Sequence, residues 1–392
     1  MSAFTLPEPS LDPLLNLISQ YRADTRSNKI DLGVGVYRDD NGHTPVLAAV
    51  KTAEARLYES QDSKSYLGLT GDSDFVDVLG NLLFQSPTGR SVAGAQTPGG
   101  SGALRLAAEL YKTAYPDNTL WVGLPTWPNH LPLVESVGIK TATYPYFSRE
   151  KQALLFDSML EHLSNASAGD AVLLHGCCHN PTGADLSSTQ WSELATLLAD
   201  KELIPIVDLA YHGLGDGLLQ DLNGTRTVIQ HCPQTLVATS CSKNFGLYRD
   251  RVGAVYMVAD NKALAIRAQA YFGHVARRIY SMPPDHGAAV VKMILTDSNL
   301  RQEWQTELGT MVQRLNTLRK AIAAAGASIG LEFVSEQKGM FSLLPLSPEQ
   351  VDSLIGDHAV YLAGDGRINI AGCQPPHLEH FIESLKSVDF HF

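Results

Sequence analysis

The stretch Thr235-Leu-Val-Ala-Thr-Ser-Cys-Ser-Lys-Asn-Phe-Gly-Leu-Tyr-Arg-Asp-Arg251 places Lys243 just beyond a short apolar run. We predict that residues 236–239 form a buried strand of an α/β sheet. Ligands of such sheets bind beyond the carboxyl ends of the strands, so Lys243 is expected to face a crevice. The hydroxyls of Ser240 and Ser242 and the guanidinium of Arg251 give this crevice a cluster of donors the size of a phosphate.

A lysine in such a crevice has a particular chemistry. Partial desolvation and nearby cations lower the pKa of its amine, and the neutral amine can attack a carbonyl to form a Schiff base. The cofactor that needs both a Schiff-base lysine and a phosphate anchor is pyridoxal 5′-phosphate. Taken alone, a lysine in a loop is more often a solvated surface residue than a catalytic one, so the prediction depends on the rest of the chain.

Size and charge narrow the class of protein. A chain of 392 residues is long enough for about two domains. The net charge of −11 argues against a nucleic-acid or anionic-membrane partner, and no apolar run approaches the ~20 residues that span a bilayer. Residues 1–20 lack the pattern of a secretory signal, so we expect a cytoplasmic protein. Its five cysteines are expected to be reduced thiols rather than metal ligands: Cys177, Cys178, Cys232, Cys241 and Cys373.

Apolar runs and helical patterns alternate through the middle of the chain. The apolar runs are residues 120–122, 171–174, 204–207 and 236–239, and helices are expected near residues 129–137 and 188–200. This alternation predicts an α/β fold, with a mostly parallel mixed sheet flanked by helices. We assign residues 46–310 to this large domain.

The ends of the chain have a different character. Residues 1–12 contain two prolines and precede a third, which predicts an extended arm. Residues 311–392 read as a smaller α+β unit, with a hairpin across Asp365-Gly366, and residues 13–45 are expected to pack with it. Between the two units, apolar residues at helical spacing from Trp304 to Ile322 predict one long helix.

Gln96-Thr-Pro-Gly-Gly-Ser-Gly-Ala-Leu104 is a glycine-rich turn that leads into a helix. Free backbone N–H groups at a helix N-terminus can hold a phosphate, and Gly100 and Ser101 are candidates. Such a turn could also belong to a dinucleotide site. Against that alternative, the segment before Gln96 reads as a poor strand, and no strand-end acidic residue follows about 20 residues later.

Three apolar runs end in polar residues of different chemistry: Asn180, Asp208 with Tyr211, and Lys243. A pyridoxal ring needs an anion beside its nitrogen, a role that suits Asp208. Tyr211 and Asn180 can donate to the phenolic oxygen of the ring. Each residue alone has an ordinary structural explanation, such as a helix cap or a turn, but their combination favours a cofactor site.

Two further residues lie close together in Leu124-Pro-Thr-Trp-Pro-Asn-His130. Trp127 offers an apolar face on which the ring could stack, although it could equally be a core aromatic residue. His130 could hold Asp208 from behind.

Five motifs together resemble the class I aminotransferases, in particular the aspartate and aromatic subgroup. They are Ser-Cys-Ser-Lys243-Asn-Phe-Gly-Leu-Tyr, His-Gly-Cys-Cys-His-Asn180-Pro-Thr-Gly, Asp208-Leu-Ala-Tyr211, Gln96-Thr-Pro-Gly-Gly-Ser-Gly-Ala-Leu and Gly-Arg367-Ile-Asn-Ile-Ala-Gly. The resemblance implies a fold-type I pyridoxal-phosphate enzyme that forms a homodimer with shared active sites. It implies that Lys243 binds the cofactor aldehyde and that the other cofactor contacts are Gly100, Ser101, Trp127, Asn180, Asp208, Tyr211, Ser240, Arg251 and, from the other subunit, Tyr66.

The same resemblance implies ping-pong transamination, in which Lys243 acts as base and then acid. It matches Arg367 to the residue that binds the α-carboxylate and Arg277 to a partner-subunit residue that binds a side-chain carboxylate. Gly35, Trp127 and Asn180 are the other expected substrate contacts. We therefore expect aspartate as donor and 2-oxoglutarate, or a smaller acid such as glyoxylate, as acceptor.

Aromatic amino acids remain an alternative substrate class. Ser65, Ser101 and Met282 lie where the two branches of the subgroup differ, and their mixture does not decide between the branches. Two other classes of protein also fit parts of the pattern. A nicotinamide dehydrogenase would purify without a yellow cofactor, and a regulator built on this fold would bind the cofactor without turnover.

Overall fold

The computed structural model describes residues 13–84 and 89–392. The predicted arm at residues 1–12 lies outside the described residues. The α-helices are α1 (Pro13–Ala23), α2 (Ala48–Ser60), α3 (Ser73–Phe84), α4 (Gly99–Ala114), α5 (His130–Glu135), α6 (Phe156–Leu163), α7 (Ser188–Asp200), α8 (Asn223–His231), α9 (Lys262–Ile279), α10 (His286–Thr296), α11 (Ser298–Ala325), α12 (Pro348–Gly356) and α13 (Leu378–Ser387). The strands are β1 (Ile30–Asp31), β2 (Ser91–Pro98), β3 (Thr119–Leu124), β4 (Lys140–Pro145), β5 (Phe147–Ser148), β6 (Ala153–Leu154), β7 (Ala171–His175), β8 (Ile204–Leu209), β9 (Gln234–Ser240), β10 (Val252–Ala259), β11 (Phe341–Leu343), β12 (Val360–Tyr361) and β13 (Arg367–Asn369).

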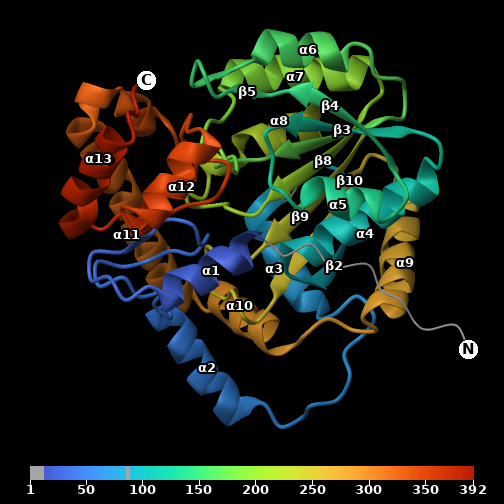
Figure 1. Cartoon of the computed structure of the whole chain (residues 1–392). Helices are drawn as coiled ribbons and strands as arrows, with labels where there is room; N and C mark the ends of the chain where they lie inside the picture. Colours follow the sequence, from blue (N-terminus) through green and yellow to red (C-terminus); the bar gives the residue numbers. More distant parts are fainter. Residues whose placement is uncertain (1–12, 85–88) are drawn as a thin grey trace, which may run out of the picture.

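A seven-stranded sheet forms the centre of the molecule, in the order β2-β10-β9-β8-β7-β3-β4 (Figure 1). From β9 to β4 every neighbouring pair is parallel, whereas β10 runs antiparallel to both β2 and β9. The predicted α/β class and the mostly parallel mixed sheet are therefore confirmed. Polar residues that end β8 and β9 emerge at one edge of this sheet.

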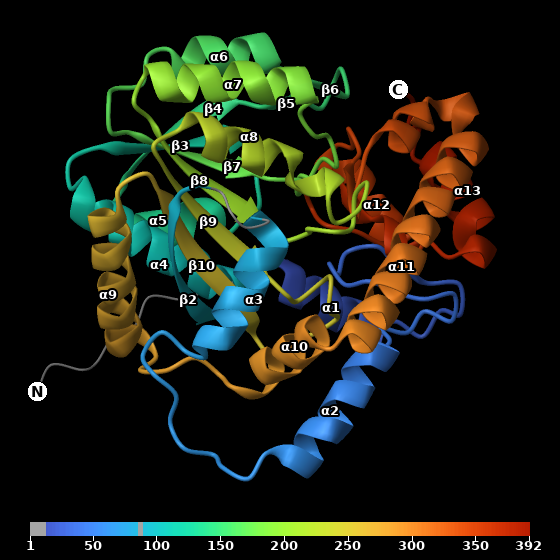
Figure 2. The same cartoon turned by 180° about the vertical axis from the view of Figure 1, so that it is seen from behind.

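Helices cover both faces of the sheet, because alternate strand residues point in opposite directions (Figure 2). Leu173 and Ile206 belong to the apolar cluster that contains α4 and α9. Leu174 packs with α6 and α7 on the other face, and Val207 packs there with α3 and α10. None of the described helices is long and apolar enough to cross a membrane.

The prediction that the segment before Gln96 is a poor strand was wrong. Residues Ser91–Pro98 form β2, which pairs antiparallel with β10 along its whole length. The run Ala93-Gly-Ala95 lacks the large residues typical of strands, but Tyr256 on β10 covers Gly94 so closely that an added Cβ would lie 2.7 Å from its ring. Tertiary packing thus overrides a weak local preference.

The C-terminal part has two short strand pairs instead of the expected hairpin. The chain does turn at Gly366, which has a φ of +84°. However, β12 before the turn pairs with β1, and β13 after it pairs with β11. The turn therefore delivers Arg367 to a strand that begins at that residue.

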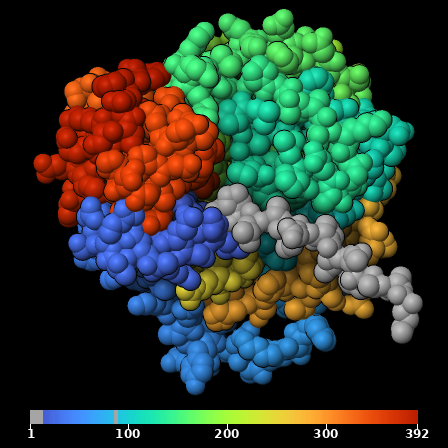
Figure 3. Space-filling view, viewed as in Figure 1, coloured from blue at the N-terminus to red at the C-terminus, as the bar shows by residue number. Residues whose placement is uncertain are grey.

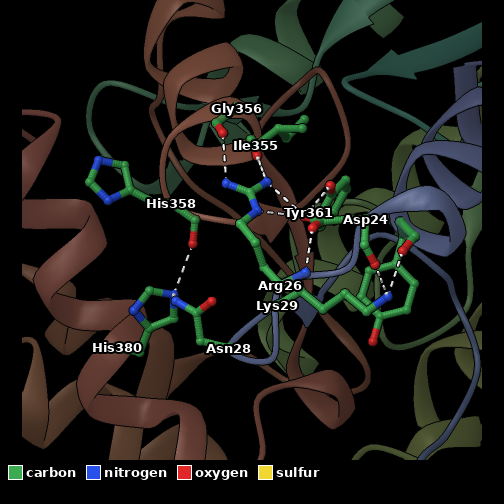
Figure 4. A network of polar contacts seen from close by, with 10 residues as sticks. Asp24, Arg26, Asn28, Lys29, Ile355, Gly356, His358, Tyr361 and His380 are labelled. Atoms are coloured by element: carbon green, nitrogen blue, oxygen red, sulfur yellow. Dashed lines mark hydrogen bonds and ion pairs between the residues drawn. The ribbon is translucent and has the colours of Figure 1, made fainter.

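Two cations lie at helix ends in this region, and one of them, Arg26, links the segment after α1 to the C-terminal part (Figure 4). Arg26 donates to the carbonyls of Ile355 and Gly356 at the end of α12, and its backbone N–H bonds Asp24. Lys29 donates to the carbonyls of Tyr21 and Asp24 at the end of α1. A cation is favourable at a helix C-terminus, where carbonyl groups lack partners in the helix.

In the space-filling view, the blue residues that follow position 12 lie directly against the orange and red C-terminal residues (Figure 3). The parallel pairing of β1 with β12 makes the same contact. The predicted division into a large domain (residues 46–310) and a small domain (residues 13–45 and 311–392) stays a prediction, because these contacts do not show where one domain ends and the other begins.

The predicted long helix is α11, and its residue Trp304 joins it to the loop that carries Lys243. Trp304 is fully buried and stacks on Phe245, with ring centroids 4.4 Å apart. Its indole N–H donates to the carbonyl oxygen of Asn244 at 2.8 Å.

Replacing Trp304 by phenylalanine should lower the free energy of unfolding by about 1–3 kcal/mol, because it leaves a cavity and an unpaired carbonyl. Urea denaturation of the purified protein measures this change. Gln305→Ala, at the exposed neighbouring position, should stay within about 0.5 kcal/mol of the parent chain. Equal losses in the two variants would contradict the role given to Trp304.

Candidate active site

A cavity of about 200 Å³ opens beyond the carboxyl ends of β8 and β9. Ten of the residues predicted from the sequence line it: Gly35, Gly100, Ser101, Trp127, Asn180, Asp208, Tyr211, Ser240, Lys243 and Arg251. Five others complete the lining: Leu104, His175, Ala210, Ser242 and Tyr248. Residues separated by more than two hundred positions thus meet in one cleft.

Asp208 is the buried anion of this cleft. It occupies β8, where the backbone pairs with β7 and β9 on its two sides. Burial by itself raises the pKa of a carboxyl group, but the hydrogen bond from His130 and the positive charge of Lys243 hold the pKa of Asp208 below its ordinary value. The distance from His130 Nε2 to Asp208 Oδ2 is 3.0 Å, which confirms the predicted contact.

Thr126 extends this contact into a chain of polar groups. Its hydroxyl lies 2.7 Å from His130 Nδ1 and 3.1 Å from His175 Nε2. When neutral His130 donates from Nε2 to Asp208, its Nδ1 can only accept, so the Thr126 hydroxyl donates to it and accepts from His175. Burial, together with the neighbouring His130 imidazole, lowers the pKa of His175 to about 3 and so keeps His175 neutral.

The amine of Lys243 lines the same cleft. Burial lowers the pKa of Lys243 to about 8; Arg251 and Arg367 contribute in the same direction, and Asp208 opposes them. The Nζ atom is 4.7 Å from the centre of the Tyr211 ring. A substantial fraction of the amine is therefore neutral near physiological pH, as a nucleophile or general base requires.

Donors gather at one end of the cleft, beside the start of α4. Arg251 Nη1 lies 3.4 Å from Ser242 Oγ and 3.1 Å from the carbonyl oxygen of Tyr248. Gly99, the first residue of α4, has a φ of +71°, and a Cβ there would lie 2.6 Å from Arg251 Nη2. The guanidinium therefore lies against the positive end of a 16-residue helix, an arrangement that suits an anion.

Arg367 lies beside the cleft rather than in its lining. Its side chain is buried and donates to Asn180 Oδ1 and to the carbonyl oxygen of Gly33, both at 3.2 Å. Asn180 Nδ2 in turn lies 3.4 Å from the Tyr211 hydroxyl. The predicted substrate arginine and two predicted ring contacts therefore form one hydrogen-bonded group.

Tyr66 and Arg277 lie outside the cleft of their own chain. Tyr66 is 92% exposed, and Arg277 near the end of α9 is exposed and donates to Ser281 Oγ at 2.8 Å. The two segments are neighbours, since the backbone N–H of Leu67 contacts Met282 Sδ at 2.9 Å. The cleft of a single chain therefore contains neither of these two side chains.

His175 and Tyr248 line the cleft but were not predicted from the sequence, whereas Ser242 was expected in the donor cluster before Lys243. His175 ends β7 and pairs in register with Asp208 on β8, so its place at the end of an apolar run was an available signal. Tyr248 accepts a hydrogen bond from the backbone N–H of Tyr37 at 2.8 Å, a contact between distant segments that no local pattern indicates.

Comparisons with known proteins agree with this geometry. Residues 27–385 match the family described as "Aminotransferase class I and II". A tyrosine aminotransferase of Rhizobium meliloti is 51% identical over 366 residues, 92% of this chain and 93% of that protein. An aspartate aminotransferase of Haemophilus influenzae is 43% identical over 388 residues, covering 96% and 97% of the two chains.

Solved structures give the same result. The aromatic-amino-acid aminotransferase from Burkholderia pseudomallei, covalently bound to pyridoxal phosphate, superposes with a TM-score of 0.95 at 35% identity, over 99% of this chain and all of that one. The fold and the cleft are therefore those of a transferase of amino groups. The chain belongs to the class I and II aminotransferase family, as its motifs predict.

The pKa of Lys243 gives a test of the electrostatics in the cofactor-free protein. Labelling of this lysine by an amine-selective reagent should be half-maximal near pH 8, compared with 10.5 for an ordinary lysine. Asp208→Asn should move the midpoint to lower pH, because it removes an anion that stabilises the ammonium form. Arg251→Leu should move it to higher pH. Mass spectrometry of the labelled peptide gives the midpoints, and a parent value near 10 would refute this description of the pocket.

Proposed function

We propose that the protein is a pyridoxal-phosphate-dependent aminotransferase that moves amino groups between an amino acid and a 2-oxo acid by a ping-pong mechanism. Its preferred donor is aspartate, and its acceptor is 2-oxoglutarate or a smaller acid such as glyoxylate. The observation that carries this proposal is the placement of Lys243 and Asp208 in one cleft, with Arg251 and the start of α4 at its end.

The residues of the cleft fit the cofactor at three points. The α4 N-terminus with Gly100 and Ser101, together with Ser240 and Arg251, offers donors for the phosphate. The Asp208 carboxylate, kept ionised by its partners, suits a protonated ring nitrogen. Trp127 lines the same space and offers a flat apolar surface, while Asn180 and Tyr211 can serve the ring oxygen.

Pyridoxal phosphate, when bound, supplies an aldehyde for amino groups and a ring that withdraws electrons from the substrate α-carbon. The chain supplies the proton transfers. Neutral Nζ of Lys243 would take the proton from the substrate α-carbon as a general base and, as a general acid, would deliver it to the cofactor carbon that carried the aldehyde. Asp208, oriented by His130, stabilises positive charge on the ring, and Arg367 orients the substrate through its α-carboxylate.

Recognition of a dicarboxylic substrate needs a second cation. We assign it to Arg277 of a second copy of the chain, with Tyr66 of that copy reaching the phosphate. The exposure of both side chains and the contact between their segments support this homodimer. A two-pronged arginine–carboxylate contact contributes roughly 1.5–3 kcal/mol, enough to favour a dicarboxylate about ten- to a hundredfold.

Aromatic amino acids are the second candidate substrates. The relative at 51% identity is named a tyrosine aminotransferase, which favours this reading over aspartate alone. The aspartate aminotransferase at 43% identity favours the dicarboxylate reading. Dual specificity for aspartate and aromatic donors would satisfy both observations.

Lys243→Ala should abolish transamination and remove the adduct that borohydride traps between protein and cofactor. The reason is that no other amine lines the cleft within the described residues. Activity with aspartate and mass spectrometry after reduction test the two statements. Lys51→Ala, at an exposed helix position, should retain both activity and adduct. A trapped cofactor on another lysine would refute the assignment.

Arg277→Leu should reduce kcat/KM for aspartate by about ten- to a hundredfold, while phenylalanine loses far less, because only aspartate has a second carboxylate. A panel of amino donors against 2-oxoglutarate, glyoxylate and other 2-oxo acids measures both donor and acceptor preference. Arg278→Leu, at the exposed adjacent position, is the matched control. Equal losses with both donors would end the dicarboxylate proposal.

A further inference from the structure

Arg319 on α11 is a buried cation that the chemistry above does not use. Its side chain is only 1% exposed, and it forms no ion pair with a carboxylate within the described parts of the chain. Burial lowers the pKa of Arg319 to about 10, while Cys178 and Asp185 act in the opposite direction. Burying a guanidinium is unfavourable, and an apolar side chain of similar size would commonly be at least as stable there.

The guanidinium of Arg319 is satisfied by one short segment. Its donors contact the Ser342 hydroxyl at 2.9 Å and the carbonyl oxygens of Val334, Lys338, Gly339 and Phe341, the shortest at 2.6 Å. Five acceptors from residues 334–342 therefore bind the single guanidinium group of Arg319. This arrangement fixes the path of residues 338–342, which form no long regular element.

On one side this segment supports the loop that carries Asn180. The backbone N–H of Lys338 donates to the carbonyl oxygen of Gly183 at 2.7 Å. A Cβ on Gly183 would lie 2.4 Å from the carbonyl oxygen of Phe341, and a Cβ on Gly339 would lie 2.5 Å from Cys178 Cβ. The two loops touch backbone to backbone, so a shift of the segment moves the loop.

On its other side the segment supports Arg367. The ring of Phe341 lies under the Arg367 guanidinium, 4.5 Å from its central carbon, and Leu343 pairs in register with Arg367. The same ring meets Tyr211 edge-on at 5.6 Å. Residues 338–343 therefore contact the elements of both partners in the hydrogen bond between Arg367 and Asn180.

We propose that Arg319 is a positioning residue for substrate carboxylate binding: by fixing residues 338–342, it sets where Arg367 and Asn180 meet beside the cleft. This inference rests on the proposed role of Arg367 in binding the α-carboxylate. Arg319 itself is not among the residues that line the cleft. Its effect is expected on substrate affinity, not on proton transfer at Lys243.

The test compares holoenzymes of the parent chain with Arg319→Lys and Ser342→Ala. Succinate, a dicarboxylate without an amino or oxo group, reports carboxylate binding in calorimetry without turnover. Arg319→Lys keeps the charge but loses the planar fork, so we expect about tenfold weaker succinate binding and a similar rise in KM for aspartate. The kcat and the absorbance of the bound cofactor should change little. Ser342→Ala removes one acceptor and should weaken succinate binding about threefold.

Arg301→Lys, exposed on the same helix, is the matched control and should leave every reading unchanged. A lower melting temperature with parental succinate binding in both test variants would show a purely structural role and overturn the inference. Should Arg319→Lys not fold, Ser342→Ala decides alone. Arg367→Lys separates the two proposals. If Arg367→Lys binds succinate as the parent does, the proposed role of Arg367 in carboxylate binding fails, and the inference about Arg319 fails with it. If Arg367→Lys weakens succinate binding but Arg319→Lys and Ser342→Ala do not, only the role of Arg319 is overturned.

Discussion

The active cleft depends on a carboxylate that is buried without losing its charge. Placing Asp208 out of water costs several kcal/mol unless hydrogen bonds and nearby cations offset the cost. His130 provides the hydrogen bond, and Lys243 provides the opposite charge across the cleft. The same anion keeps the pKa of the lysine from falling further, so the two groups tune each other. The parallel sheet makes this possible, since it brings the ends of β8 and β9 side by side.

The C-terminal part of the chain places Arg367 beside the cleft. Arg367 takes this place because the turn at Gly366 starts a strand that pairs with β11. Its neighbours along β11 are held by Arg319, a residue of the helix that runs between the two parts of the molecule. The residues proposed for the chemistry and the arginine proposed for substrate binding thus come from different parts of the fold, and they meet at Asn180.

The ends of the central strands could be predicted from the sequence because each apolar run stops at a polar residue of distinct chemistry. Asp208, Asn180 and Lys243 were found in this way, and His130 followed from its place near Trp127. Other features depend on distant contacts and left no local signal. Strand β2 exists because β10 pairs with it, and the strands around Gly366 pair with partners elsewhere instead of with each other.

The hydroxyl of Thr126 is a further case, since its role depends on two imidazole rings that reach it from helix α5 and strand β7. Tyr66 and Arg277 mark a different limit. Their roles were inferred by resemblance, and one folded chain leaves both side chains in solvent. Geometry within a single chain therefore accounts for the cofactor end of the cleft better than for the end that distinguishes substrates.

The reversal of β10 has a consequence for how this enzyme can vary. Residues 241–251 connect β9 to β10, and these two strands are antiparallel neighbours in the sheet. Both ends of the connection are therefore anchored about one strand spacing apart, with Lys243 near its entrance and Arg251 at its exit. An insertion or deletion in this connection would change the position of the Lys243 amine relative to Arg251 at the anion-binding end of the cleft. Among descendants of this gene the length of that connection should stay constant, even where surface loops lengthen freely.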